Sequence, residues 1–228
     1  MTTSTSLSAA LARCSGRLRP RALAVLVLLA PAVAAGAQDA ERDVRRVFDR
    51  YQAAVVAADG EATLAAVDRR TVAYYGTMVG LALDADSATV AALPFMDRLM
   101  VLSLRHRVPA DTLRAFDGAR AFAYGVAHGW TDQGAAARQS LGGVRVAGDS
   151  ASADLLLNGV AVPGVAFGFV REEGWRLDLT SVLDASAPAM RAAVEEMGET
   201  EDGFIVFALR ALTGRAPGPE LWRPVGRP

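Results

Sequence analysis

Residues 140–182 alternate apolar and polar side chains with a period of two, and three turn signals divide this stretch. The turns are Gly148-Asp149, Asn158-Gly159 and Glu172-Glu173-Gly174. Because successive side chains point to opposite faces of a strand, the pattern predicts an antiparallel sheet of about four strands joined by hairpins. Helical patterns lie before and after this stretch rather than between its strands, which indicates the α+β class.

Each turn fixes a register, and the apolar partners show which register is self-consistent. The predicted pairs are Val144 with Ala153, Val146 with Ala151, Leu157 with Val160, Leu155 with Val162, Phe167 with Leu179 and Phe169 with Leu177. The middle hairpin needs a one-residue slip to bring Phe167 and Phe169 to the apolar face, and Pro163-Gly164 is the natural place for a bulge. The last hairpin needs a three-residue loop with Gly174 in the left-handed conformation.

Helical periodicity covers most of the remaining chain after residue 38. The predicted helices span 39–58, about 61–68, 71–83, Ser87 to the residue before Pro94, Pro94 to His106, Pro109 to His128, 187–197 and 201–213. Asp59-Gly60 is expected to end the first helix, and Thr200 and Gly214 to begin and end the last. The residues expected to face inward on the two C-terminal helices are Met190, Ala193, Val194, Met197, Phe204, Ala208, Leu209 and Leu212.

The N-terminal segment has the pattern of a secretory signal peptide. Four arginines precede an apolar run over 22–30, and the segment closes on Ala35-Gly36-Ala37, an A-x-A cleavage pattern. The run is short for a membrane span and Pro31 interrupts it, so we expect cleavage before Gln38 and no stable membrane anchor afterwards; the alternative is an uncleaved anchor. The expected organisation is a leader (1–37), a single α+β domain (38–214) and a tail rich in proline and glycine (215–228), in an exported protein of the periplasm or the medium.

Composition excludes several functions. After the leader the chain keeps all 25 acidic residues but loses four of its 24 arginines, so it is mildly acidic and has no basic cluster for nucleic acid. The absence of lysine excludes Schiff-base chemistry, and the single cysteine, Cys14, lies in the leader. His106 and His128 lack a metal-ligand spacing, and there is no glycine-rich phosphate loop. We therefore expect no metal and no cofactor.

Two stretches resemble the nuclear-transport-factor-2-like superfamily. The first is the opening helix and its successor, Val44-Arg-Arg-Val-Phe-Asp-Arg-Tyr51 through Asp59-Gly-Glu-Ala-Thr-Leu64. The second is the strand pair Phe167-Gly-Phe-Val-Arg-Glu-Glu-Gly-Trp-Arg-Leu-Asp-Leu179, which is one residue shorter than the family's common form because Trp175 directly follows Gly174. The resemblance implies a cone-like fold in which a curved sheet wraps a helix around a cavity. Residues 69–130, which are helical in pattern, and the two C-terminal helices depart from the family.

Members of this superfamily include ketosteroid isomerase, dehydratases, polyketide cyclases and proteins without known activity, so the fold alone selects no function. The apolar residues that would line a ligand pocket are Phe95, Trp130, Phe167, Phe169, Trp175 and Leu177. Tyr74 and Tyr75 offer phenol donors to a carbonyl ligand, although adjacent residues of a helix cannot both face inward. His106 shares a helical stripe with apolar residues, which favours packing and leaves a pocket role as the alternative.

Asp178 alternates with Leu177 and Leu179, so it faces away from the apolar cluster, on the same side as Arg176. We expect this side to face solvent, where Asp178 is an ordinary strand charge. If the side lined a cone cavity instead, Asp178 would be the best-placed general base, with His106 or a tyrosine as its partner.

Three hypotheses of function remain. The first is an exported, non-catalytic protein that binds a small apolar molecule or a protein partner through a cavity. The second is a cofactor-free isomerase, dehydratase or cyclase that uses Asp178 with Tyr74, Tyr75 or His106. The third is a structural envelope protein, or a homodimer formed through the open face of the sheet.

Overall fold

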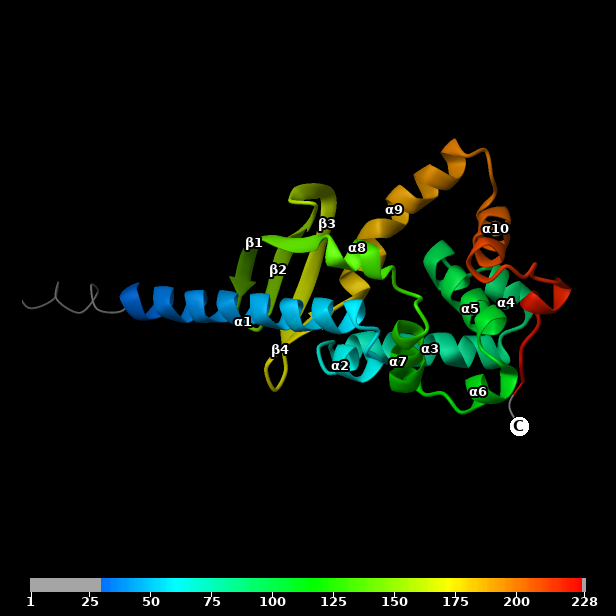
Figure 1. The fold of residues 1–228 in the computed structure, drawn as a ribbon, viewed down its shortest axis with the longest axis horizontal. Coiled ribbons are helices and arrows are strands. Elements are labelled where there is room, and N and C mark those ends of the chain that lie inside the picture. Colours follow the sequence, from blue (N-terminus) through cyan, green and yellow to red (C-terminus); the bar gives the residue numbers. More distant parts are fainter. Residues whose placement is uncertain (1–29, 227–228) are drawn as a thin grey trace, which may run out of the picture. The chain divides into compact units, whose positions relative to one another are not determined.

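The computed structural model describes residues 30–226. The chain divides into two units, residues 1–38 and 39–228, and the second contains the sheet (Figure 1). In the first unit, the described residues 30–38 are helical and open α1 (Ala30–Val56). Residues 1–29 of the expected leader lie outside the described part, so its cleavage stays a prediction. None of the described helices has both the length and the apolar character needed to span a membrane.

The order of elements is a series of helices, then four strands, then two helices and a 3-10 turn, which confirms the α+β class. After α1 they are α2 (Gly60–Leu64), α3 (Arg69–Asp84), α4 (Ser87–Ala91), α5 (Phe95–Arg107), α6 (Ala110–Arg114), α7 (Gly118–Ala127), α8 (Gln133–Ala137), β1 (Gln139–Ala147), β2 (Ser150–Leu157), β3 (Val160–Arg171), β4 (Trp175–Asp178), α9 (Thr180–Glu196), α10 (Glu201–Thr213) and η1 (Pro219–Trp222).

The four strands form one antiparallel sheet in the order β1-β2-β3-β4. The pairs that confirm the predicted registers are Val144 with Ala153, Val146 with Ala151, Leu157 with Val160 and Phe169 with Leu177. Asn158 and Gly159 both have positive φ, 52° and 78°, as the tightest hairpin turns require. The registers predicted from the turn residues and their apolar partners are therefore correct for these pairs.

Three details of the predicted registers were wrong. Between Leu156↔Ala161 and Asp154↔Ala166, β2 advances two residues and β3 five, so the bulge around Gly164 is larger than one residue and Leu155 does not pair with Val162. Across this bulge β3 has five residues against two in β2, an excess of three. Because an odd excess reverses the facing of the side chains, as a one-residue slip would, the large side chains beyond it still reach the apolar face. The other two errors are at the end of the sheet. Gly174 is not among the residues with positive φ, and β4 ends before Leu179 reaches Phe167.

One face of the sheet packs against α1, and this is the first of two hydrophobic cores. The rings of Phe48 on α1 and Phe167 on β3 lie 5.1 Å apart. The sheet is neither strongly curled nor closed, so the cone-like enclosure is not seen. The free edge of β4 is covered by residues 66–68, because Leu177 exchanges backbone hydrogen bonds with Ala66 and Asp68.

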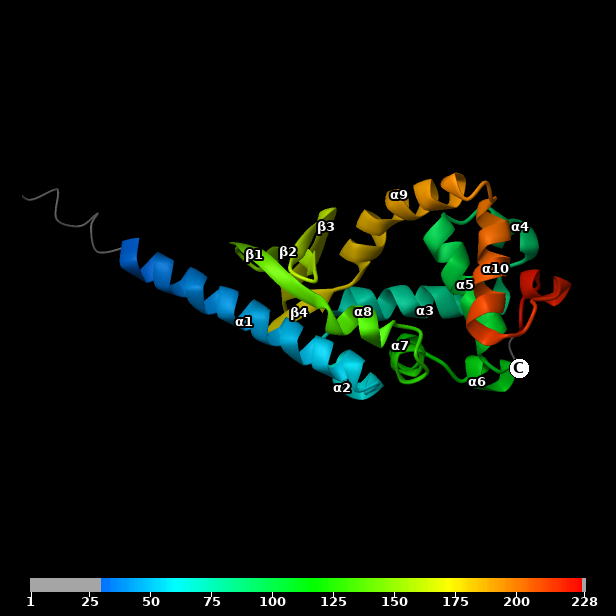
Figure 2. The same cartoon turned by 45° about the horizontal axis from the view of Figure 1, so that its top comes forward.

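The second core lies among α3, α5, α7, α9, α10 and η1 (Figure 2). Two close approaches allow α7 to pack here: a side chain on Gly118 would collide with the Val72 carbonyl of α3, and one on Gly60 with the Ala123 carbonyl. The C-terminal tail is held against this core, because Leu221 is buried and Gly226 donates a 2.9 Å hydrogen bond to the Leu83 carbonyl.

Several predicted helix boundaries needed correction. The helix expected from Pro109 to His128 is two helices, because the Asp117 carboxylate caps α7. Asp59 caps α2 instead of ending α1, and Ala58, with φ 54°, makes the turn. Asp86 rather than Ser87 caps α4. The first C-terminal helix starts at Thr180 and contains Pro188, whereas Thr200 and Gly214 bound α10 as predicted. Contrary to expectation, the side chains of Ala193, Met197 and Leu212 are exposed.

Candidate functional site

One stripe of α5 faces a pocket in the helical core. Met96, Met100, Ser103 and Arg107 recur at the i, i+4, i+7 and i+11 spacing and all line this pocket. The pocket has a volume of about 290 Å³ and is enclosed by residues of α3, α5, α7, α9 and α10. The space is partly open to solvent, so a small molecule can reach it from the surface.

The wall of the pocket is predominantly apolar. Tyr75 of α3 and Phe122 of α7 meet edge to face, with ring centroids 5.1 Å apart. The other apolar residues of the wall include Met96, Leu99, Met100, Val126, Trp130, Leu183, Met190, Phe204, Ala208 and Leu212. Gly125 brings the backbone of α7 against the Trp130 ring, since a Cβ there would lie 3.3 Å from that ring. Such a wall suits an apolar molecule.

A few polar groups are set into this wall. The Tyr75 and Ser103 side chains make no hydrogen bond to any described residue, although both line the pocket. Burial raises the pKa of Tyr75 to about 12, so its phenol remains a hydrogen-bond donor at neutral pH. Sparse hydroxyls in an apolar pocket can orient a ligand without making the pocket polar.

Arg107 lies at the end of the stripe. Its guanidinium carbon is 4.5 Å from the centroid of the Trp130 ring, a cation–π contact. Burial lowers the pKa of Arg107, and within the described residues its side chain has no ion pair and no hydrogen bond. The pocket therefore has an unpaired cation in its wall.

The structure places the predicted pocket residues and the two candidate tyrosines in three different surroundings. Trp130, Tyr74 and Tyr75 line the apolar pocket, so the expectation that only one of the adjacent tyrosines could face inward was wrong. Phe95 is buried against Phe204, with ring centroids 6.0 Å apart, and borders a neighbouring groove of about 470 Å³. The remaining four belong to the sheet core and line no part of the pocket: Phe167, Phe169, Trp175 and Leu177.

Asp178 does not face solvent, contrary to the expectation from strand alternation. It is 6% exposed, and one carboxylate oxygen accepts hydrogen bonds from the backbone and the hydroxyl of Thr180. The other oxygen forms an ion pair of 3.1 Å with Arg70. The strand ends at this residue and α9 begins directly after it, so the side of the strand that alternation assigned to solvent is covered by the start of a helix.

The alternative catalytic residues do not form one hydrogen-bonded set. The His106 ring bonds to the Thr213 hydroxyl at 2.9 Å, and burial and Arg215 lower the pKa of His106. Tyr74 donates a 3.0 Å hydrogen bond to Asp97, while Asp178 is held by Arg70 and Thr180 as described above. These partners place the three side chains in separate networks. The described residues also contain no group of three or more His, Cys, Asp or Glu arranged to hold a metal.

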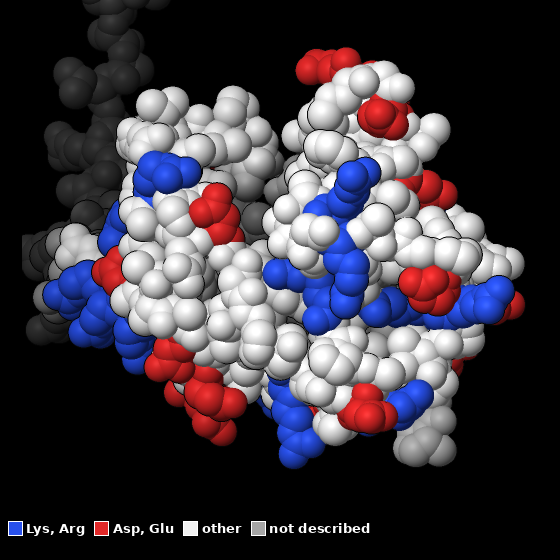
Figure 3. Space-filling model, turned by 45° about the vertical axis from the view of Figure 1, so that its right-hand side comes forward, with Lys and Arg blue, Asp and Glu red and all other residues white. Residues whose placement is uncertain are grey.

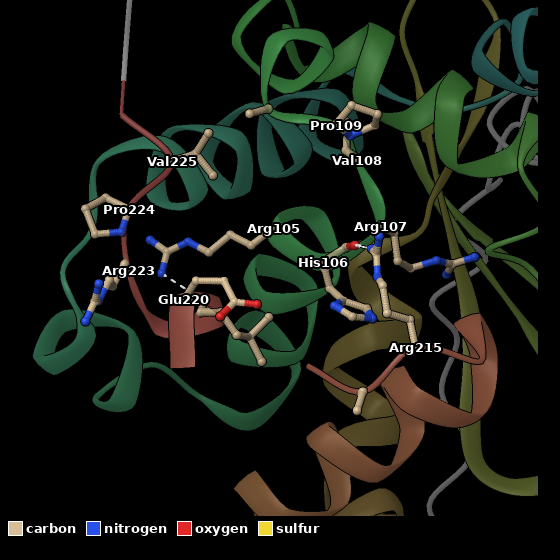
Figure 4. A pocket seen from close by; sticks show the side chains of 13 residues that line it. Arg105, His106, Arg107, Val108, Pro109, Arg215, Glu220, Arg223, Pro224 and Val225 are labelled. Atoms are coloured by element: carbon tan, nitrogen blue, oxygen red, sulfur yellow. Dashed lines mark hydrogen bonds between the residues drawn. The ribbon is translucent and has the colours of Figure 1, made fainter. Parts of the chain in front are cut away.

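A groove of about 680 Å³ lies between the end of α5 and the C-terminal segment (Figure 4). Arg105 and Arg107 point in opposite directions from α5 in this view. Arg105 donates to the backbone carbonyls of Leu81, Ala82 and Ala85, so its guanidinium already has partners. Figure 3 shows a face of the molecule on which basic side chains form a band beside broad uncharged areas. The residues that line the groove include four arginines and one acid, Glu220, so the groove is basic, whereas the smaller pocket is apolar.

The stripe Met96, Met100, Ser103 and Arg107 was not singled out in the sequence. Its helical spacing is visible there, beside the apolar stripe of Phe95, Leu99 and Leu102 that His106 shares. Comparison of the chain with protein-family models finds no match. No curated protein and no solved structure matches it significantly either.

Proposed function

We propose that this protein binds a small, mainly apolar molecule in the pocket between α3, α5, α7, α9 and α10, and that binding rather than catalysis is its function. The observation that carries the proposal is the wall of that pocket, which is built of aromatic rings, methionines and leucines with a few unused hydroxyls. Its volume, about 290 Å³, is at the small end of the usual range of roughly 300–1,000 Å³ for ligand pockets.

The proposal places the ligand among the helices rather than under the sheet. The sheet face that would line a cone is filled by α1 through contacts such as Phe48 with Phe167. Membership of the nuclear-transport-factor-2-like superfamily stays a proposal, supported by the packing of the opening helix on the sheet. Export stays a proposal that depends on the pattern of the leader.

A non-catalytic function is favoured over the isomerase, dehydratase or cyclase alternative. A general base needs its substrate within hydrogen-bond reach, but Asp178 is engaged by Arg70 and Thr180 and does not line the apolar pocket. The homodimer alternative is also not favoured, because the face of the sheet away from α1 carries Ser152 and the paired charges Arg145 and Asp154.

Blocking the pocket tests the proposal. Ala208 lines the pocket, so Ala208→Phe fills it, whereas Ala211→Phe adds the same ring to an exposed position of α10. We expect the neutral fluorescent probe phenylnaphthylamine to bind the full chain at one saturable site. Ala208→Phe should weaken this binding by about tenfold or more, equivalent to about 1.4 kcal/mol, and Ala211→Phe should not change it. Equal binding by both variants would contradict the proposal.

A further inference from the structure

A second pocket adjoins the apolar one. Its volume is about 350 Å³, and it shares Arg107, Trp130 and Leu212 with the apolar pocket. The rest of its wall is polar: Tyr124, His128, Thr213 and Arg215. Apolar and polar spaces that meet at one guanidinium match the two ends of an amphipathic molecule.

Neither pocket has an acidic residue in its wall, so both arginines lack a carboxylate partner there. Arg215 donates to the His106 carbonyl, as Figure 4 shows, and Arg107 makes no hydrogen bond at all within the described residues. Glu220 borders the larger groove beside these arginines, but it forms no ion pair with either of them.

Two other arginines withdrawn from solvent in this unit have acidic or backbone partners. Arg98, 10% exposed at its side chain, forms ion pairs with Glu201 and Asp202 and donates to a backbone carbonyl. Arg105 donates to several carbonyls. Arg107 and the half-buried Arg176 of β4 have neither kind of partner among the described residues, but only Arg107 of the two lines the two pockets, where a bound anion would pair with it.

Resting on the proposed function, we propose that the ligand is an amphipathic carboxylate. Its apolar body occupies the pocket beside Met96 and Met100, and its carboxylate lies at the boundary of the two pockets against Arg107, with Arg215 as the second cation. The contact with Trp130 holds one face of the Arg107 guanidinium, which leaves the N–H edge to form paired hydrogen bonds with a planar carboxylate.

The test compares decanoate with decanol, which share the chain and differ in the head group, both below their micellar concentrations and near neutral pH. We expect the full chain to bind decanoate about tenfold more tightly than decanol in calorimetric titration, because a charge-assisted pair forms with only one of them. Arg107→Met should bring the ratio of the decanoate and decanol affinities to about one, because the charge-assisted pair can no longer form. Arg107→Lys keeps the charge without the planar fork and should retain part of the preference.

Arg171→Met is the matched control, because Arg171 also lies over a tryptophan, 4.9 Å from the Trp175 ring, but at the sheet. It should leave both affinities unchanged. Equal wild-type affinities for decanoate and decanol, or an unchanged preference in Arg107→Met, would overturn the carboxylate inference and leave the apolar pocket standing. Tighter binding of decyl sulfate than of decanoate would overturn the carboxylate assignment as well. Failure of both decanoate and decanol to bind would overturn the proposed function and this inference together.

Discussion

The core beside the sheet and the core among the helices are filled to different degrees. Beside the sheet, the alternating side chains of the strands meet α1, with Phe122 and Val126 of α7 beside it, and Phe169 and Leu177 are almost completely buried. Among the helices, five helices converge from different directions, and a pocket of about 290 Å³ remains where they meet. An alternating sheet presents a regular apolar face that packed helices can cover completely. Helices that converge from several directions fill the space between them only if their lengths and crossing angles fit one another.

The largest expected effect contrasts the same truncation in the two cores. Phe169→Ala removes a 1% exposed ring from the sheet core and should lower the free energy of unfolding by about 3–5 kcal/mol. Phe204→Ala, in the pocket wall, should cost only about 1 kcal/mol, because its ring already borders open space. Urea denaturation of both variants measures this difference. Equal losses would mean that the helical core is as tightly filled as the sheet core.

The second contrast concerns glycines inside the helical region. Gly118→Ala places a Cβ 2.1 Å from the Val72 carbonyl oxygen, so we expect a loss of about 1–3 kcal/mol from overpacking. Gly80, in α3, has open space around it, and Gly80→Ala should stabilise the helix by about 0.5–1 kcal/mol. Thermal melting of the two variants should therefore shift in opposite directions. A tolerated Gly118→Ala would show that α3 and α7 are not in close contact.

The third contrast concerns the turns of the sheet. Gly159 has φ 78°, so Gly159→Ala should cost about 1 kcal/mol from the left-handed conformation alone. Gly174 lacks a positive φ and has no neighbour near its missing Cβ, so Gly174→Ala should stay within about 0.5 kcal/mol of the parent. A larger loss for Gly174→Ala than for Gly159→Ala, measured by urea denaturation, would reverse the assignment.

The smallest expected effect is a pH dependence in the helical region. Burial and Arg215 hold the pKa of His106 below 6.5, and Arg107 acts in the same direction while Glu220 opposes it. The unfolded chain therefore takes up a proton more readily than the native chain. The stability contributed by neutral His106 is present above pH 6.5 and is lost as the pH falls through the folded pKa. Relative to His106→Gln, the parent should lose stability over this range; parallel curves would refute the assignment.

The sheet could be predicted in large part because its signals are local. Asn158-Gly159 and Gly148-Asp149 each fix a register within a few residues, and the apolar partners confirm it. The errors arose where distant segments decide the outcome. Asp178 follows the strand period, but the start of α9 covers it, and periodicity does not report that covering.

The pocket could not be predicted, although its residues are visible in the sequence. The stripes through Phe95 and through Met96 both follow the helical spacing of α5. Periodicity identifies an apolar face, but not which face is filled by another helix and which borders a space. The unpaired state of Arg107 likewise depends on which acidic residues lie near it after folding, and composition does not reveal this.

The central claim is that a ligand binds in the pocket among the helices. Methionine methyl groups test it most directly, because some of them line the pocket and others lie in the filled core or on the surface. Met96, Met100 and Met190 line the pocket, whereas Met78 lies in the filled part of the core and Met197 is exposed. In carbon-13 methyl NMR of the full chain, phenylnaphthylamine should shift the signals of the three pocket methionines and leave those of Met78 and Met197 in place. Unchanged pocket signals at saturating probe, or shifts confined to Met197, would contradict a ligand site among the helices.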